Sequence, residues 1–161
     1  MQRRTFLGLL LTGSASLGLS GCGYRLRGLD TPGPAISELA ISGSDSDFAG
    51  MVQERLESGD THVHAHAALV LNLGDEEFRE RPLGVQDTGP REMEMSLRVP
   101  FSVQRRSDGA YRLPQQSLEV VTRFTVSDDN LLAQEEIREE AQQELRRDAT
   151  RRLLDRLRSL E

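Results

Sequence analysis

Cys22 is the only cysteine of the chain, and the residues before it favour covalent attachment of lipid. Residues 19–22 read Leu-Ser-Gly-Cys, the order that bacterial lipoprotein processing recognises: an apolar residue, two small residues and a cysteine whose thiol accepts a diacylglycerol. A single thiol in an exported protein has no disulfide partner within its own chain. We therefore predict that Cys22 carries lipid and becomes the first residue of the mature protein.

Residues 1–21 have the profile of an export signal that is removed. Arg3 and Arg4 precede an apolar stretch that ends at Thr12, as in a signal peptide. This stretch is much shorter than the roughly 20 residues that a membrane-spanning helix requires. The two arginines also fit a twin-arginine motif, so the sequence leaves the export route open.

Acyl chains on Cys22, palmitate among them, would hold the protein on a membrane surface, because several chains together bury enough methylene groups for stable anchoring. Gly23 follows the cysteine, whereas an Asp at that place is the usual signal for retention at the inner membrane. We therefore expect the protein at the outer membrane, facing the periplasm.

Three histidines at a spacing of two residues could share a metal ion. If His62, His64 and His66 lie on one face of a strand, their imidazoles suit zinc, copper or nickel. The alternation of apolar and polar residues over 63–73 indicates instead three exposed polar side chains opposite a buried face. We therefore predict no metal site.

Neither motifs nor charge indicate an enzyme or a nucleic-acid-binding protein. A run of carboxylates could suggest acid–base catalysis, but it alternates with arginines, and we expect a solvated strand end or loop. The run comprises Asp75, Glu76, Glu77 and Glu80. Residues 22–161 contain 18 basic and 26 acidic residues, hence a formal charge of −8, which does not favour nucleic acid. We predict no catalytic residue and no cofactor.

The hydropathy pattern predicts about four strands. Apolar residues alternate along each of them, and the clearest example runs from Met93 to Val103, with Pro100 indicating a sheet edge or a bulge nearby. Asp108 and Gly109 form a hairpin turn signal before the partner strand. The expected strands cover residues 36–41, 63–73, 93–103 and 118–126.

Two amphipathic helices complete the pattern. The first begins at residues 45–47 and stops at Ser58 and Gly59. The second covers some 25 residues to Leu160, with Glu in its first half and Arg in its second, as the helix dipole favours. The order predicts an α+β fold in two layers, a mixed sheet with both helices packed on one face. We expect a single domain over residues 36–161, joined to the lipid by a tether over residues 22–35.

Arg98 and Arg123 lie on neighbouring expected strands and point away from the core. Guanidinium groups suit anionic phosphates or carboxylates, so the pair could contact such a ligand. They could instead serve solubility, with weak ion pairs across the strands to Glu92, Glu94 or Glu119. The residues themselves leave both readings open.

Residues 22–28, Cys-Gly-Tyr-Arg-Leu-Arg-Gly, resemble the opening of the lipopolysaccharide-assembly lipoprotein family LptE. In that family the lipidated cysteine is followed by Gly, an aromatic residue and a Leu-Arg pair. The resemblance continues from Glu92 through the alternating strand, the hairpin and the arginine-bearing strand. It ends with the Asn-Leu-Leu-Ala junction at 130–133 and the acidic-to-basic helix that closes at residues 156–157.

The resemblance implies a partner protein rather than an enzyme. It implies a plug inside LptD, the outer-membrane β-barrel of the lipopolysaccharide translocon, that assists barrel assembly and the passage of lipopolysaccharide to the outer leaflet. Arg98 and Arg123 would then make polar contacts with lipopolysaccharide or the barrel wall. Tyr24, Arg25 and Arg27 would pack the tether against the barrel.

Two other classes remain open from the sequence. One is a lipoprotein adaptor of a different envelope lipid-transport complex, with the same small fold and no barrel. The other is a metal-binding lipoprotein that uses the three histidines. Co-purification would identify the first, and stoichiometric bound metal would identify the second.

A Cys22→Ala change should release the protein into the periplasm without unfolding it, because no expected core position is altered. Fractionation into membrane and soluble protein, followed by circular dichroism of the soluble form, tests this. An unfolded soluble product would count against a tethered domain.

Overall fold

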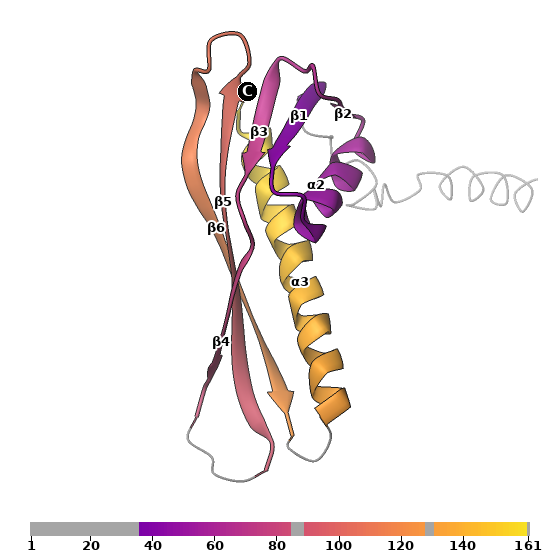
Figure 1. Cartoon of the computed structure of the whole chain (residues 1–161), viewed down its shortest axis with the longest axis vertical. Helices are drawn as coiled ribbons and strands as arrows, with labels where there is room; N and C mark the ends of the chain where they lie inside the picture. The colour runs from indigo at the N-terminus through magenta and orange to yellow at the C-terminus, as the bar shows by residue number, and fades with distance from the viewer. Residues whose placement is uncertain (1–35, 85–88, 128–130, 161) are drawn as a thin grey trace, which may run out of the picture. The chain divides into compact units, whose positions relative to one another are not determined.

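A computed structural model describes residues 36–84, 89–127 and 131–160 (Figure 1). These residues belong to one unit that covers residues 32–161. The predictions for the signal, Cys22, Gly23, the tether and its Tyr24, Arg25 and Arg27 lie outside the described residues. The elements, in chain order, are β1 (Glu38–Gly43), α2 (Asp47–Glu57), β2 (His62–Val63), β3 (Leu69–Leu73), β4 (Glu77–Pro82), β5 (Arg91–Arg105), β6 (Tyr111–Val126) and α3 (Leu131–Arg158).

The α+β class is confirmed, and six strands form one mixed sheet in the described residues. One reason for the larger number of strands is that the predicted strand over residues 63–73 is not continuous. It is divided into β2 and β3 by a turn in which the amide of Ala67 donates to the carbonyl of His64 (3.2 Å). Ala65 lies in this turn and is exposed, against the expected alternation. Alanine has a low strand propensity, so the alanines at 65, 67 and 68 favour a strand only weakly.

β5 is the central strand of the sheet. On one side it pairs antiparallel with β6 over almost its whole length. On the other side it pairs with β3 through residues 101–105 and with β4 through residues 93–98, so β3 and β4 lie end to end (Figure 1). β1 adds to β3 in parallel, and β2 adds to β1.

Pro100 lies at the break between β3 and β4. The amide of Gly74 donates to the carbonyl of Pro100 (2.8 Å), and a Cβ atom on Gly74 would lie 2.5 Å from Cγ of the proline ring. The β5–β6 register shifts between Phe101 and Val103, which confirms the predicted bulge. Proline has no amide hydrogen to donate to a neighbouring strand. Because Pro100 lies beside the gap between β3 and β4, no hydrogen bond between strands is lost there.

The core lies between the sheet and the two helices, both of which pack on one face as predicted (Figure 1). The α2 side chains Phe48, Val52 and Leu56 are fully buried. Ser46 caps this helix, accepting a hydrogen bond from the amide of Ala49 (3.2 Å). The long helix α3 buries a stripe at steps of four: Ala141, Leu145, Ala149, Leu153 and Leu157. Each fully buried leucine contributes about 1.5–3 kcal/mol through removal from water.

Glu76, in the break between β3 and β4, joins both helices. Its Oε1 accepts a hydrogen bond from the amide of Phe48 in the first turn of α2 (3.1 Å). Its Oε2 pairs with Nε of Arg146 in α3 (2.7 Å), and the two side chains are only 9% and 12% exposed. The guanidinium also lies over the ring of Phe78, 5.2 Å from its centroid. One carboxylate therefore fixes three segments of the chain.

Arg146→Met should lower the free energy of unfolding by about 3–5 kcal/mol, because Glu76 would keep a buried charge without its counterion. The double variant with Glu76→Leu should lose less than the sum of the two single changes. Urea unfolding followed by circular dichroism measures both.

Arg138→Met is the control for that cycle. Arg138 pairs with Glu80, and these side chains are 29% and 27% exposed, so we expect a loss of about 1 kcal/mol or less. Equal losses for the two arginines would contradict a special role for the Glu76 contact.

Candidate functional site

The face of β4, β5 and β6 that points away from α3 is almost entirely polar. Leu97 of β5 is buried against the helices, and residues one place along the strand point to the opposite face. We call this surface the outer sheet face. It consists of Glu77, Arg79 and Arg81 of β4, Glu92, Glu94, Ser96 and Arg98 of β5, and Glu119, Val121, Arg123 and Thr125 of β6.

Glu94 is held between two arginines on this face. It lies opposite Arg81 on one side and opposite Arg123 on the other. Its carboxylate is 2.6 Å from Nη2 of Arg81 and 3.7 Å from Nε of Arg123, and its side chain is 12% exposed. The expected ion pair across the strands is therefore confirmed for Arg123. The sequence did not identify Arg81, because its strand was not predicted.

Arg98 has a different environment. Its register neighbours are Glu77 and Glu119, yet its Nε donates to the hydroxyl of Ser117 (3.3 Å). Within the part of the chain that the structure describes, no carboxylate lies within 4.0 Å of its guanidinium. Arg98 is thus an exposed cation whose guanidinium pairs with no carboxylate of the described residues.

The structure does not bring Arg98 and Arg123 together. Arg98 lies opposite Glu119, whereas Arg123 lies opposite Glu94, so the two positions are four residues apart along the ladder. At about 3.3 Å per residue this separates their backbones by about 13 Å. We therefore consider the two residues separately.

The histidines do not share a strand face. His62 belongs to β2, whereas His64 and His66 lie in the turn that follows. Nε2 of His64 is 3.4 Å from the carboxylate of Glu38. Over residues 36–84, 89–127 and 131–160, no group of three ligating side chains could hold a metal ion. The arrangement that made a shared metal plausible is therefore absent from this region.

The run of carboxylates has structural partners that differ from residue to residue. Asp75 accepts a hydrogen bond from Ser44, Glu76 pairs with Arg146, and Glu80 pairs with Arg138. The prediction of a solvated strand end or loop is wrong for Glu76, which is largely buried. Its burial could not be inferred from the sequence because its partner is 70 residues away.

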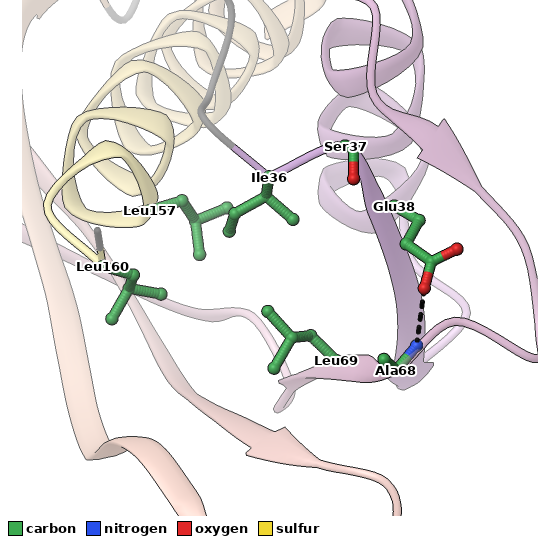
Figure 2. Close-up of a pocket in the computed structure, with 7 residues that line it drawn as sticks. All are labelled: Ile36, Ser37, Glu38, Ala68, Leu69, Leu157 and Leu160. Atoms are coloured by element: carbon green, nitrogen blue, oxygen red, sulfur yellow. Dashed lines mark hydrogen bonds between the residues drawn. The ribbon is translucent and has the colours of Figure 1, made fainter.

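An apolar hollow of about 310 Å³ lies where β1, β3 and the end of α3 meet. Figure 2 shows Ile36, Leu69, Leu157 and Leu160 around it, with Glu38 at its border accepting a hydrogen bond from the amide of Ala68 (3.3 Å). The hollow offers one carboxylate and no cation, so it does not suit an anionic ligand.

The helices do not have membrane-spanning character. Neither described helix is both long enough and apolar enough to cross a bilayer. In α3 the exposed charged residues are acidic through Glu144 and largely basic from Arg147 onward, which confirms the predicted order of charges.

Comparison with known proteins gives a family and a fold. The family model described as LptE, Lipopolysaccharide-assembly, matches residues 34–157. Comparison with curated protein sequences gave no significant match.

Three solved structures are similar to this chain in fold. A minor lipoprotein from Acinetobacter baumannii has a TM-score of 0.64 and 13% identity, covering 76% of this chain and 91% of its own. The rare lipoprotein B from Shewanella oneidensis has a TM-score of 0.62 and 21% identity, covering 76% and 94%. Lipoprotein B from Nitrosomonas europaea has a TM-score of 0.65 and 16% identity, covering 83% and 88%.

Glu94→Gln should lower the free energy of unfolding by about 1 kcal/mol, because the carboxylate loses its charge while two arginines remain beside it. Glu77→Gln is the matched control. Glu77 lies 3.7 Å from Arg79, with the two side chains 51% and 75% exposed, so its loss should be less than about 0.5 kcal/mol. Urea unfolding measures both, and equal effects would show that Glu94 does not organise this face.

Proposed function

The chain belongs to the lipopolysaccharide-assembly family LptE, and on that premise we propose that it is a lipoprotein that plugs an LptD-like outer-membrane β-barrel. In this role it binds the barrel from the periplasmic side, assists its assembly and helps lipopolysaccharide to enter the outer leaflet. Lipid on Cys22 anchors it to the outer membrane. It acts by binding and carries out no chemical reaction.

The outer sheet face is the observation that supports this proposal best. Neither helix covers it, and its side chains are charged or hydroxylic except for Val121, which is 50% exposed. Large outer-membrane barrels have a polar interior. A charged sheet can meet such a wall through hydrogen bonds and ion pairs without burying unpaired apolar surface against it.

Arg98 is the residue of this face that we assign to a partner contact. A guanidinium without a counterion can take a carboxylate or phosphate through paired N–H donors. Arg123 already shares Glu94 with Arg81, so any contact it makes is weakened by that carboxylate. Tyr24, Arg25 and Arg27 are assigned to the tether and would contact the barrel where the chain enters it.

The first experiment is a pull-down of the lipidated chain from its own envelope in detergent, with mass spectrometry of proteins recovered in near-equal amount. Recovery of a large β-barrel protein supports the plug. Recovery of inner-membrane components alone would favour the adaptor of another lipid-transport complex, and recovery of no partner would contradict both.

Arg98→Ser should reduce recovery of the barrel about fivefold to tenfold, since one charge-assisted contact is lost. Arg105→Ser is the control, because Arg105 is the last residue of β5 and pairs with Asp108 in a solvent-exposed ion pair. Arg123→Ser should have a smaller effect than Arg98→Ser. If all three variants recovered as much of the barrel as the unchanged chain does, the outer sheet face would be excluded as the barrel contact.

A further inference from the structure

A second surface, on the opposite side of the fold from the outer sheet face, combines apolar area with arginines. It is a groove of about 450 Å³ between α2 and α3. We call it the helix groove, and it is lined by Met51, Glu54, Arg55, Ser58, Arg147, Thr150 and Arg151.

Two arginines of the helix groove have no counterion among the described residues. Arg55 of α2 and Arg147 of α3 are exposed, and within the described residues no carboxylate is close enough to form an ion pair with either. Arg151 is paired with Asp148. Within the part of the chain that the structure describes, the groove thus presents two guanidinium groups that form no ion pair, one from each helix.

The floor of the groove is apolar or already satisfied. Met51 is half-buried, and its thioether adapts to irregular apolar partners. The hydroxyl of Thr150, 6% exposed, donates to the carbonyl of Arg146 (2.8 Å). A ligand that enters the groove therefore meets the side chain of Met51 beside those of the arginines.

The charge of the helix groove distinguishes it from its neighbour. The hollow between β6 and α3 shares Arg147 and Arg151 and adds Arg123, but Glu140, Glu144 and Asp148 balance these cations. The helix groove is lined by three arginines and the carboxylate of Glu54, and Arg151 is neutralised by Asp148, so Arg55 and Arg147 face one carboxylate. The groove therefore has a small local excess of positive charge in a chain whose formal charge is −6.

We propose that the helix groove binds the headgroup of an anionic phospholipid. The phosphodiester accepts hydrogen bonds from Arg55 and Arg147, and the first methylene groups of an acyl chain lie against Met51. Guanidinium groups match phosphate oxygens in geometry and charge, and arginine stems cover apolar surface while their charged ends remain in water. Glu54 opposes the ligand by charge repulsion. Phosphate groups of a glycolipid share this chemistry, so the test must separate the two sources.

The test uses the full chain, purified in dodecyl maltoside, with its methionine methyl groups labelled with ¹³C. The probe is dihexanoyl phosphatidylglycerol, a short anionic phospholipid. The Met51 methyl resonance, assigned with Met51→Leu, should shift and saturate. Met95, 2% exposed in the sheet core, should not shift and serves as the internal reference.

Variants locate the contact. Arg55→Gln and Arg147→Gln should each weaken binding about fivefold to tenfold, and Glu54→Gln should tighten it. Arg79→Gln, on the outer sheet face, should leave affinity unchanged. Unchanged affinity for both groove variants would overturn the proposal.

Two further probes test whether the net charge of the lipid matters and whether the bound phosphate comes from a phospholipid or a glycolipid. Dihexanoyl phosphatidylcholine, which has no net charge, should bind at least fivefold more weakly, and equal binding would overturn recognition by the arginines. Hexyl phosphate, a phosphate monoester, should not bind more tightly than the phospholipid, and if it does, the occupant is a phosphorylated glycolipid instead. None of these measurements involves the barrel, so a failed pull-down and a failed titration are independent results.

Discussion

Two largely buried charged side chains, Glu76 and Arg146, form an ion pair at the break between β3 and β4. Charges removed from water must be paired and hydrogen-bonded, and here one carboxylate receives the amide of Phe48 and the guanidinium of Arg146. This requirement fixes the start of α2 against the middle of α3. It also fixes the chain immediately before β4, and therefore which residues of β4 reach the outer sheet face.

The two faces of the sheet differ because alternate side chains of each strand point to opposite sides. The helix side takes nearly all apolar residues of β5 and β6, so the charged residues between them have only solvent or a partner to face. Cross-strand register brings opposite charges to neighbouring positions, and the side-chain conformations then decide which of them pair. Glu94 falls between two arginines, whereas Arg98 donates to Ser117 and has no counterion within the described residues. The availability of Arg98 for a partner thus depends on the direction of its side chain and not on register, because its register neighbours are Glu77 and Glu119.

Much of the fold could be predicted from local patterns. The buried stripe of α3, the cap of α2 and the hairpin at Asp108 and Gly109 depend on spacing within a few turns, and all three agree with the structure. The division at residues 64–68 could not be predicted, because apolar residues continue at every second position through it. The strand β4 could not be predicted, because it is charged and gains its pairing only from β5. The positions of Arg98 and Arg123 on one polar face were predictable, but their separation along the ladder was not. The helix groove combines residues from α2 and α3 that lie about 90 positions apart in the sequence, which no local pattern reveals.

The β5–β6 hairpin also bears on how the chain reaches its folded state. Its strands are joined by only five residues, 106–110, so closing the loop costs little conformational entropy. By contrast, the parallel pairing of β1 with β3 requires the chain to pass through α2 first, and the Glu76–Arg146 pair joins residues far apart in sequence. Contacts between residues that are close in sequence, such as those of the β5–β6 hairpin, form faster than contacts between distant residues. The hairpin therefore supplies a template on which β3 and β4 can align while α3 closes over the apolar side.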